Sequence, residues 1–320
     1  MKVASLFAGC GGADLGIQGD FKYLGKTYTK RNLEFIHVSD IDAKAVATYN
    51  LNFAHQAEVQ DVRNVSLSLG ACDILVGGFP CQSFSSVNPT KDPNDDRGQL
   101  FWELVRIADE AKPKVVIAEN VRGFYSLHKG QYFHHFMDAM EKIGYDMHHA
   151  ILAANEFGVP QRRQRVFMVG FRKDMKINFK FPTVDSAASK DVPLKRVIKS
   201  LTDVPEKYYF SERAVQGVKA AKPNMKRAVA QDLDQPCLTI TSHLAKASLN
   251  SRDPVLLVDP VKEIYRRFTP EEASLIQGFP SSFKWQGSDP TIFRQIGNAI
   301  SPVVMWWLFD SVMNALKDVD

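Results

Sequence analysis

One cysteine in the chain stands where a thiol could react. Cys81 lies in the stretch GGFPCQSFS (77–85), directly after the glycines and proline that end a predicted strand, whereas buried structural cysteines usually lie inside strands. The remaining cysteines, Cys10, Cys72 and Cys237, are scattered without a Cys-x-x-Cys pair, so the sequence predicts neither a disulfide framework nor a zinc knuckle. We therefore interpret Cys81 as a nucleophile.

A carboxylate and two arginines could serve this nucleophile. The segment KVVIAEN (114–120) places Glu119 at the end of an apolar strand, where burial raises the pKa of a carboxyl and favours proton donation. In QRRQR (161–165), Arg163 and Arg165 share one side of an extended segment because successive side chains alternate. Such arginines could be ordinary surface charge, or they could stabilise a thiolate or hold an anionic substrate.

A glycine-rich loop precedes these residues in the chain. SLFAGCGGADLG (5–16) reads as a strand, a loop with Gly9 and Gly11, and a helix, which is a common ligand site at the carboxyl edge of a parallel sheet. Its glycine spacing departs from the dinucleotide pattern, and no Gly-Lys-Ser/Thr follows for a phosphate chain. Asp40 and Asp61 end the next two strands, where carboxylates suit a nucleoside, although capping of a helix or turn is the commoner role of a single Asp.

Alternating elements must position these residues. β-rich runs alternate with helical patterns over the first half of the chain, which predicts an α/β fold with a mostly parallel sheet and crossover helices. The predicted strands are 3–7, 34–38, 73–77, 114–118, 147–153 and 165–169. Helices are predicted at 98–112 and 132–144, and again at 269–277 and 300–316.

The middle of the chain differs from its flanks. After Gly170 the sequence becomes proline-punctuated and aperiodic, and residues 171–260 hold 16 Lys and Arg against 10 Asp and Glu, a net of +6 in a chain whose total is +4. A polyanion-binding module would show this excess, and so would solvated surface lysines. We expect a catalytic domain at 1–174, a second, irregular domain at 175–288, and a C-terminal helix that returns to the first domain at 289–320.

Other features of the composition limit the classes of protein. The apolar residues never run long enough without charge to span a bilayer, and the N-terminal MKVASLFAG lacks the pattern of a secretory signal, so we expect a cytoplasmic protein with no membrane partner. The pairs His134-His135 and His148-His149 look like metal ligands. No third ligand stands at a useful spacing, so packing or surface roles are favoured and no metal is expected.

Taken in order, the motifs resemble those of the DNA cytosine-5 methyltransferase family, of the bacterial and phage restriction-modification type. The resemblance covers nearly the whole chain. The matching motifs are FAGCGG (7–12), GGFPCQSFS (77–85), RGQLF (97–101), ENV (119–121), QRRQR (161–165), RRFTPEE with QGFP (266–280) and GNAISP (297–302). The fold implied is that of S-adenosylmethionine-dependent methyltransferases, a Rossmann-like sheet with a small irregular target-recognition domain.

The resemblance also implies a mechanism. Cys81 adds to C6 of a cytosine that has swung out of the DNA stack, Glu119 hydrogen-bonds or protonates N3, and Arg163 and Arg165 hold the base. S-adenosylmethionine donates the methyl group and lies against Gly9 and Gly11. The implied cofactor contacts are Phe7 by the adenine, Asp40 on the ribose, Asp61 on the adenine amine, and Ile41, Pro80, Leu100 and Asn298 around the site.

The resemblance implies partners as well. Double-stranded DNA is the expected substrate, bound by a monomer through the basic segment, where PCLTI (236–240) matches a Thr-containing turn of the family, and a cognate restriction endonuclease would act on the same site. Asp40 departs from the family's usual Glu and is one methylene group shorter. An RNA (tRNA) cytosine-5 methyltransferase on the same fold is the alternative. A cysteine hydrolase, a nicotinamide oxidoreductase and a noncatalytic DNA-binding module explain fewer of the motifs.

Overall fold

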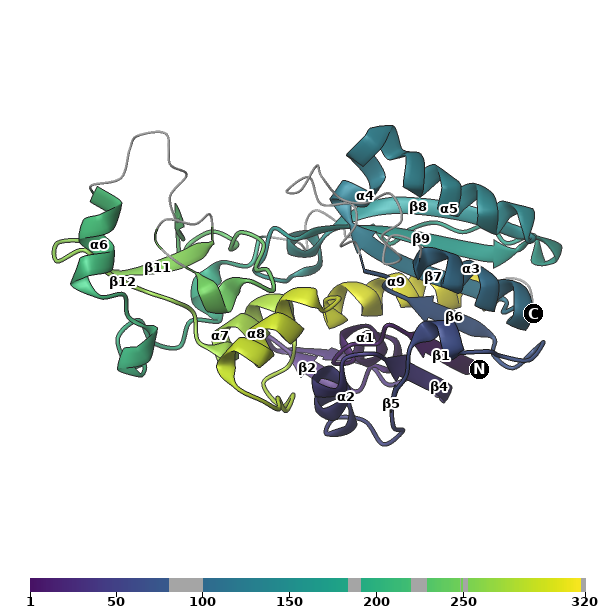
Figure 1. Cartoon of the computed structure of the whole chain (residues 1–320), viewed down its shortest axis with the longest axis horizontal. Coiled ribbons are helices and arrows are strands. Elements are labelled where there is room, and N and C mark those ends of the chain that lie inside the picture. The colour runs from purple at the N-terminus through teal and green to yellow at the C-terminus, as the bar shows by residue number, and fades with distance from the viewer. Residues whose placement is uncertain (81–99, 184–190, 220–228, 248, 250–252, 318–320) are drawn as a thin grey trace.

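A computed structural model describes residues 1–80, 100–183, 191–219, 229–247, 249 and 253–317 (Figure 1). The expected nucleophile, Cys81, lies outside these residues. So do residues 82–99, which follow it, and parts of the basic middle segment.

A seven-stranded sheet forms the larger part of the molecule, in the order β5-β4-β1-β6-β7-β9-β8 (Figure 1). Its strands are β1 (Lys2–Leu6), β4 (Glu34–Asp40), β5 (Glu58–Val59), β6 (Ile74–Gly77), β7 (Val115–Val121), β8 (Tyr145–Ala153) and β9 (Gln164–Arg172). The strands from β5 to β7 in this order pair in parallel. Strand β9 is antiparallel to both of its neighbours, β7 and β8, so it alone runs opposite to the other six strands. The prediction of an α/β fold with a mostly parallel sheet is therefore confirmed.

Helices cover both faces of this sheet. They are α1 (Gly12–Gln18), α2 (Ala43–Asn50), α3 (Leu100–Ala111), α4 (Arg122–Ser126), α5 (Gln131–Lys142) and α9 (Pro302–Lys317). Because side chains alternate along a strand, Val115 and Ile117 of β7 join a core with α1 and α9, while Val116 and Ala118 join a second core with α3 and α5. Glu119 follows in the alternation and shares the α9 face with Ile117.

A short hairpin that the sequence did not predict lies between β1 and β4. Its strands are β2 (Phe21–Tyr23) and β3 (Lys26–Tyr28), joined by Leu24 and Gly25, both with positive φ (45° and 85°). This is the backbone twist that two-residue hairpin loops favour, but Leu is a rare residue at such a position. The ring of Tyr28 packs edge-on against Trp306, with 5.4 Å between their centroids, and so holds the hairpin on α9.

A third core is formed by the basic middle of the chain and the helices that follow it. The elements around it are α6 (Glu212–Lys219), β10 (Val229–Ala230), β11 (Pro254–Asp259), β12 (Ile264–Arg266), α7 (Pro270–Gln277) and α8 (Asp289–Asn298). Its buried residues include Leu194, Cys237, Ile240, Leu256, Phe268, Ile276, Phe293 and Ile296. We call the elements around this core the recognition part. Helix α8 contributes to this core, whereas α9 contributes to the core beneath the large sheet.

The start of α7 follows the sequence prediction closely. Thr269 caps the helix by accepting a hydrogen bond from the backbone N–H of Glu272, whose carboxylate accepts from the Thr269 N–H at 2.8 Å. Pro270 occupies the first turn. Farther on, one segment, Asp289–Lys317, is long and apolar enough to cross a membrane by length and composition alone. Half of its most apolar stretch is buried inside the protein, and the segment divides into the two helices α8 and α9. These are properties of helices that form the core of a protein.

Candidate active site

The glycine loop joins β1 to α1 through residues in left-handed conformations. Phe7, Gly9 and Gly11 have φ values of 55°, 57° and 93°. A Cβ on Gly11 would stand 2.4 Å from the ring of Phe53, so the close approach of backbone and ring requires glycine. The loop thus presents bare backbone at the carboxyl edge of the sheet, where parallel α/β folds bind ligands.

Asp40 ties the glycine loop to the end of β4. Its Oδ2 accepts a hydrogen bond from the Gly9 N–H and its Oδ1 accepts from the Asp42 N–H, both at 2.8 Å. Burial raises the pKa of this carboxyl, although both backbone hydrogen bonds oppose the rise. Asp42, rather than Asp40, caps α2 by accepting from the Lys44 N–H. Asp40 therefore has its place at the loop and not at the helix end.

Ile41 and Asp61 lie at the same edge as Asp40. Ile41 is 69% exposed, which is high for so large an apolar side chain. The N–H of Gln60 donates to the Asp40 carbonyl, so Asp61 follows one residue beyond that contact. Asp61 caps a 3₁₀ turn through the Arg63 N–H and forms an ion pair with the Arg63 guanidinium, whose hydrogen bond lowers the pKa of the Asp61 carboxyl. The capping alternative thus describes the present contacts of Asp61.

Three further residues are expected at the cofactor site. Leu100 begins α3 and packs, like Phe7, against the core between α3 and the sheet. Asn298 ends α8, and the turn that follows it is so close that a Cβ on Gly12 would lie 2.3 Å from the Ile300 carbonyl oxygen. Pro80 is the last described residue before Cys81.

Glu119 and Arg165 form a buried ion pair beside the segment that leads to Cys81. Arg165 Nε lies 3.1 Å from Glu119 Oε1, and the side chains are 16% and 11% exposed. Burial raises the pKa of Glu119, opposed by the positive charges of Arg165 and then Arg163. A Cβ on Gly78 would lie 3.5 Å from Glu119 Oε2, so the carboxyl faces the chain three residues before Cys81.

Asn120, the neighbour of Glu119, anchors that same segment. Its Nδ2 donates to the Phe79 carbonyl at 3.1 Å, and its Oδ1 accepts from the Val121 N–H. The side chain is 2% exposed. Sequence reasoning assigned no role to Asn120, and its only signal was a position after Glu119 at the end of a strand.

Arg163 lies beside Arg165 but its guanidinium faces backbone. Nη1 donates to the Ile240 carbonyl at 3.1 Å, and Nη2 donates to the carbonyls of Gly297 and Ala299 at 3.0 and 3.1 Å. The side chain is 3% exposed. The guanidinium groups of Arg163 and Arg165 repel each other because both are positive. The negative ends of three carbonyl dipoles offset this repulsion and the cost of burying the Arg163 charge. Arg165 alone contacts Glu119 in an ion pair, and Arg163 connects parts of the chain that are distant in sequence.

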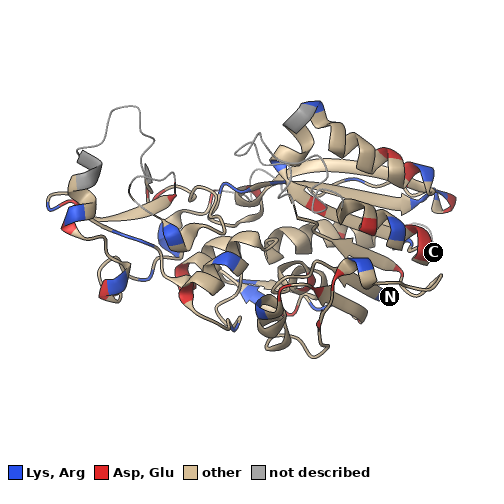
Figure 2. Cartoon of the chain, viewed as in Figure 1, with Lys and Arg blue, Asp and Glu red and all other residues tan. Residues whose placement is uncertain are grey.

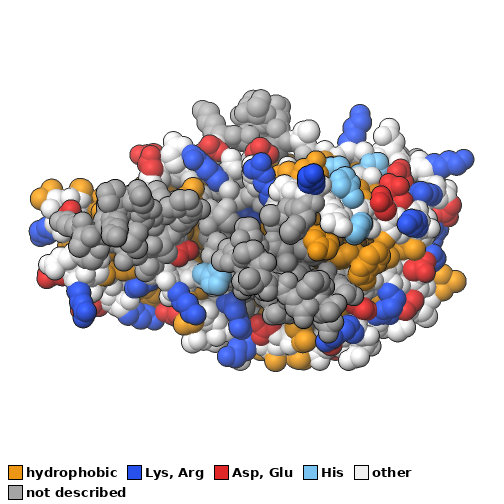
Figure 3. Space-filling view, turned by 45° about the horizontal axis from the view of Figure 1, so that its top comes forward, with side chains coloured by type: hydrophobic (Ala, Val, Ile, Leu, Met, Phe, Trp, Pro, Cys, Tyr) orange, Lys and Arg blue, Asp and Glu red, His pale blue; other side chains and the backbone are white. Residues whose placement is uncertain are grey.

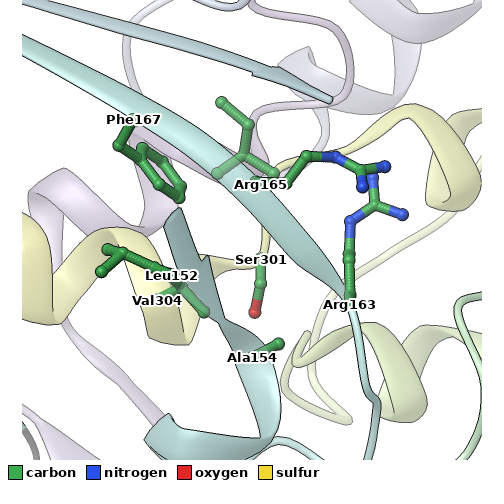
Figure 4. A pocket seen from close by; sticks show the side chains of 8 residues that line it. Leu152, Ala154, Arg163, Arg165, Phe167, Ser301 and Val304 are labelled. Carbon is green, nitrogen blue, oxygen red and sulfur yellow. The ribbon is translucent and has the colours of Figure 1, made fainter. Parts of the chain in front are cut away.

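A small pocket lies beneath the two arginines (Figure 4). It is lined by Leu152, Ala154, Arg163, Arg165, Phe167, Ile300, Ser301 and Val304. Arg163 Nε and Ser301 Oγ are buried there without a hydrogen-bond partner among the described residues. The pocket belongs to the same side of β9 as the ion pair of Glu119.

The histidine pairs take part in packing on the outer sheet edge. His149 packs edge-on against the Phe133 ring, 4.8 Å between centroids, and also lies near Tyr125. His148 Nε2 is 3.5 Å from Asp146 Oδ2. Figure 3 shows histidine side chains next to hydrophobic ones on this face. Within the described ranges, no three His, Cys, Asp or Glu residues lie together in a way that could hold a metal ion.

Basic residues of the recognition part are mixed with acidic ones (Figure 2). Lys195 pairs with Asp234 at 2.5 Å, and Lys207 pairs with Asp289 at 2.6 Å. The lysine side chains are more than half exposed. Such surface pairs are weak, so a phosphate backbone could compete for these lysines.

Comparisons with known proteins agree along the whole chain. The model of the family described as C-5 cytosine-specific DNA methylase matches residues 1–314. The Type II methyltransferases M.FnuDI of Fusobacterium nucleatum and M.NlaX of Neisseria lactamica are each 30% identical to the chain; the alignments cover 99% of the chain and 96% and 98% of the relatives.

Solved structures share the fold at lower identity. The methyltransferase EhMeth of Entamoeba histolytica superposes with a TM-score of 0.76 at 21% identity, covering 99% of the chain and 98% of the neighbour. The Dnmt2 methyltransferase of S. pombe superposes with a TM-score of 0.74 at 18% identity, covering 99% of both chains. These likenesses concern the fold alone.

Proposed function

We propose roles for individual residues from the premise that the chain belongs to the C-5 cytosine-specific DNA methylase family. As a member it methylates C5 of cytosine in DNA through a covalent intermediate, with S-adenosylmethionine as the methyl donor. The observation that carries the assignment is the buried Glu119–Arg165 pair, which faces the segment that leads to Cys81. Three kinds of role follow: cofactor binding, catalysis and DNA recognition.

The glycine loop and the strand ends around it suit S-adenosylmethionine. The donor group supplies an electrophilic methyl group and, unlike a dinucleotide, needs no cradle for a phosphate chain. Asp40 has further lone pairs that can accept from ribose hydroxyls, and the exposed Ile41 offers an apolar surface for a purine ring. We assign cofactor binding to Phe7, Gly9, Gly11, Asp40, Ile41, Asp61, Pro80, Leu100 and Asn298.

Catalysis is assigned to Cys81, Glu119 and Arg165. The Cys81 thiolate forms a bond to C6 of the flipped cytosine, and the C5–C6 π pair shifts to C4–C5. The C4–N3 π pair takes the proton of Glu119 at N3, which leaves C5 as the nucleophilic carbon of an enamine. Arg165 holds the Glu119 carboxyl in place through its ion pair. After C5 has received the methyl group, its proton passes to solvent and the C5–H electron pair re-forms the C5–C6 double bond as the C6–S bond breaks. Cys81 leaves as thiolate, and N3 returns its proton to Glu119. The resemblance gives Arg163 a base-holding role as well, whereas its guanidinium donates to carbonyls of the protein.

DNA recognition is assigned to the basic middle of the chain. We place the catalytic domain at 1–174 and the target-recognition domain at 175–288, with α8 packing on the recognition core and α9 returning to the large sheet. The enzyme acts as a cytoplasmic monomer on duplex DNA, needs no metal, and has a cognate restriction endonuclease for the same site. The relatives named as Type II methyltransferases support this last assignment.

Covalent trapping tests the catalytic assignment. Fluorine at C5 cannot leave as a proton does, so duplex DNA containing 5-fluorocytosine should capture the enzyme as a denaturation-resistant adduct when S-adenosylmethionine is present. We expect the adduct with the unchanged protein and with Cys72→Ala, a buried cysteine on β6's flank, and none with Cys81→Ala. An adduct with Cys81→Ala would overturn the assignment. A matching tRNA substrate tests the RNA alternative in the same assay.

A further inference from the structure

The segment 236–242, here called the recognition segment, is attached to the chain just before β9. Cys237 and Gln161 form a parallel β-bridge. The Cys237 N–H donates to the Pro160 carbonyl at 2.9 Å, and the Cys237 carbonyl accepts from the Arg162 N–H at 2.8 Å. The recognition segment is therefore added, like a short strand, to residues 160–163.

Two side chains then hold the backbone of Ile240, in the recognition segment, through both its N–H and its carbonyl. Gln161 Oε1 accepts from the Ile240 N–H at 2.9 Å, and Arg163 Nη1 donates to the Ile240 carbonyl at 3.1 Å. Gln161 and Arg163 are 0% and 3% exposed. Hydrogen bonds between buried side chains and backbone fix the segment whatever side chains it carries, and so leave those free to vary with the DNA sequence read.

The same two side chains are linked to the turn at the end of α8, Arg163 directly and Gln161 through Gln277. Arg163 Nη2 donates to the carbonyls of Gly297 and Ala299. Gln161 Nε2 donates to Gln277 Oε1 at 2.8 Å, and Gln277 Nε2 donates in turn to the Ala299 carbonyl. A Cβ on Gly297 would lie 2.1 Å from the Ser242 nitrogen, so this turn and the recognition segment touch backbone to backbone. Three regions far apart in sequence thus converge on Gln161 and Arg163.

The strand continues from this junction directly to the catalytic pair. Arg165 is two residues beyond Arg163 and forms the ion pair with Glu119 (Figure 4 shows the two guanidinium groups beside each other). Strand β9 pairs with β7 from Arg165 onward and with β8 from Gln164 onward. The Arg163 carbonyl also accepts from the Ala154 N–H at 2.8 Å, so the backbone between the two arginines is held along its β8 side. Leu238 of the recognition segment is 38% exposed, on the opposite side of the bridge from the core.

We propose that Gln161 and Arg163 are positioning residues that couple the recognition segment to the Arg165–Glu119 pair, so that only DNA seated correctly on the segment meets a correctly placed acid. This inference rests on the proposed function, because it takes Glu119 as the acid and 236–242 as part of the DNA-reading surface. It changes the role of Arg163: its guanidinium is committed to carbonyls of the protein rather than to the base.

The test separates positioning from simple stability. Gln161→Leu keeps the volume without the hydrogen bonds, and Arg163→Lys keeps the charge without the forked geometry. The matched control is Arg162→Lys, between the two tested residues, whose exposed guanidinium donates to Gln235 Oε1 at 2.9 Å. Active sites are first counted by trapping on the 5-fluorocytosine duplex. The methylated site is identified by sequencing DNA that the enzyme has modified. We then measure the rate per active site, the KM for DNA, and the preference for this site over a variant that differs by one base pair.

Both variants should lose rate per active site, on the order of 10²-fold, as expected for a small misplacement of a catalytic group. The KM for DNA should change little. The ratio of the rate on the methylated site to the rate on its single-base-pair variant should fall. Arg162→Lys should behave as the unchanged protein. If the variants only lower the number of active sites, or raise KM while rate per site and preference stay unchanged, the two residues are structural and the inference is wrong. Failure of trapping in the unchanged protein would instead defeat the proposed function.

Discussion

Arg165 Nε lies 3.1 Å from Glu119 Oε1 where β7 and β9 run antiparallel. The register places Val121 opposite Arg165, so Glu119, two residues earlier, is its diagonal neighbour on the same face of the sheet. The pairing of two strands therefore sets the geometry of the proposed acid, and no loop is involved. Burial and Arg165 act on the pKa of Glu119 in opposite directions.

Removing Arg165 should shift the pH dependence of methyl transfer. Burial raises the pKa of Glu119 and Arg165 counters it, so Arg165→Ala raises that pKa further. Glu119 donates only while protonated, so the alkaline limb of the rate moves to higher pH, although the maximum falls by roughly 10²–10⁴-fold with the loss of an oriented acid. Single-turnover rates across pH check this. Arg172→Ala, at the exposed end of β9, is the control, and an alkaline limb that moves to lower pH contradicts the prediction.

Asp40 should matter for the cofactor and not for DNA. Asp40→Asn leaves one of the Gly9 and Asp42 N–H groups without an acceptor, because the amide has a single oxygen. A hydrogen bond to a charged acceptor contributes about 1.5–3 kcal/mol, so affinity for S-adenosylmethionine should fall about tenfold to a hundredfold. Calorimetric titration of S-adenosylmethionine measures this, with Asp42→Asn, which keeps a helix cap, as the control. Equal affinities for the two variants would show that Asp40 does not shape the site.

The sequence predicts the sheet well because its central strands are buried on both faces. In 114–118 every apolar residue contributes to the core on one face of the sheet or on the other. The strand is therefore a continuous apolar run, with no polar residue at alternate positions to face solvent. The hairpin at Phe21–Tyr28 escapes prediction, because its strands have three residues each and its turn, Leu24-Gly25, lacks the usual residues.

The site is predicted less completely than the fold. Alternation places Arg163 and Arg165 on one side, but nothing in QRRQR tells which one meets Glu119 and which one meets carbonyls. The partners of Arg163 and Gln161 are backbone groups 77 and 79 residues away at Ile240, and a backbone group leaves no trace in residue type. Asn120 is hidden for the same reason, since it binds the Phe79 carbonyl.

A buried ion pair should be critical for the recognition core. Arg266 is 0% exposed and forms two hydrogen bonds with Glu272, at 2.8 and 2.7 Å, and further ones to the carbonyls of Ser200 and Leu201. Arg266→Met leaves the Glu272 carboxylate buried without its partner, so the free energy of unfolding should fall by about 3–5 kcal/mol.

Urea denaturation at neutral pH measures this loss. The control is Arg294→Met, whose pair with Asp42 is about half exposed and should be worth little. If Arg266→Met and Arg294→Met have the same small effect, the Arg266–Glu272 pair does not hold the recognition core together.

Asp14 should make the stability of the protein depend on pH. Its carboxyl lies behind the glycine loop at 0% exposure and accepts from the hydroxyls of Ser5 and Tyr49 at 2.7 and 2.8 Å. Burial, partly offset by these two hydrogen bonds, raises the pKa of Asp14 to about 6. Because the folded state binds this proton more tightly than the unfolded state, the stabilisation is complete below about pH 4 and is lost as pH rises through 6.

The variant Asp14→Asn removes this titration while keeping the shape of the side chain. Relative to the unchanged protein, its free energy of unfolding should therefore increase between pH 4 and pH 7, by about 3 kcal/mol for a shift of this size. Urea denaturation at several pH values gives the difference, and Asp138→Asn on the exposed face of α5 should show no such trend. A difference that stays constant or shrinks as pH rises would mean that Asp14 is ionised at little cost, held by Ser5 and Tyr49 as a carboxylate.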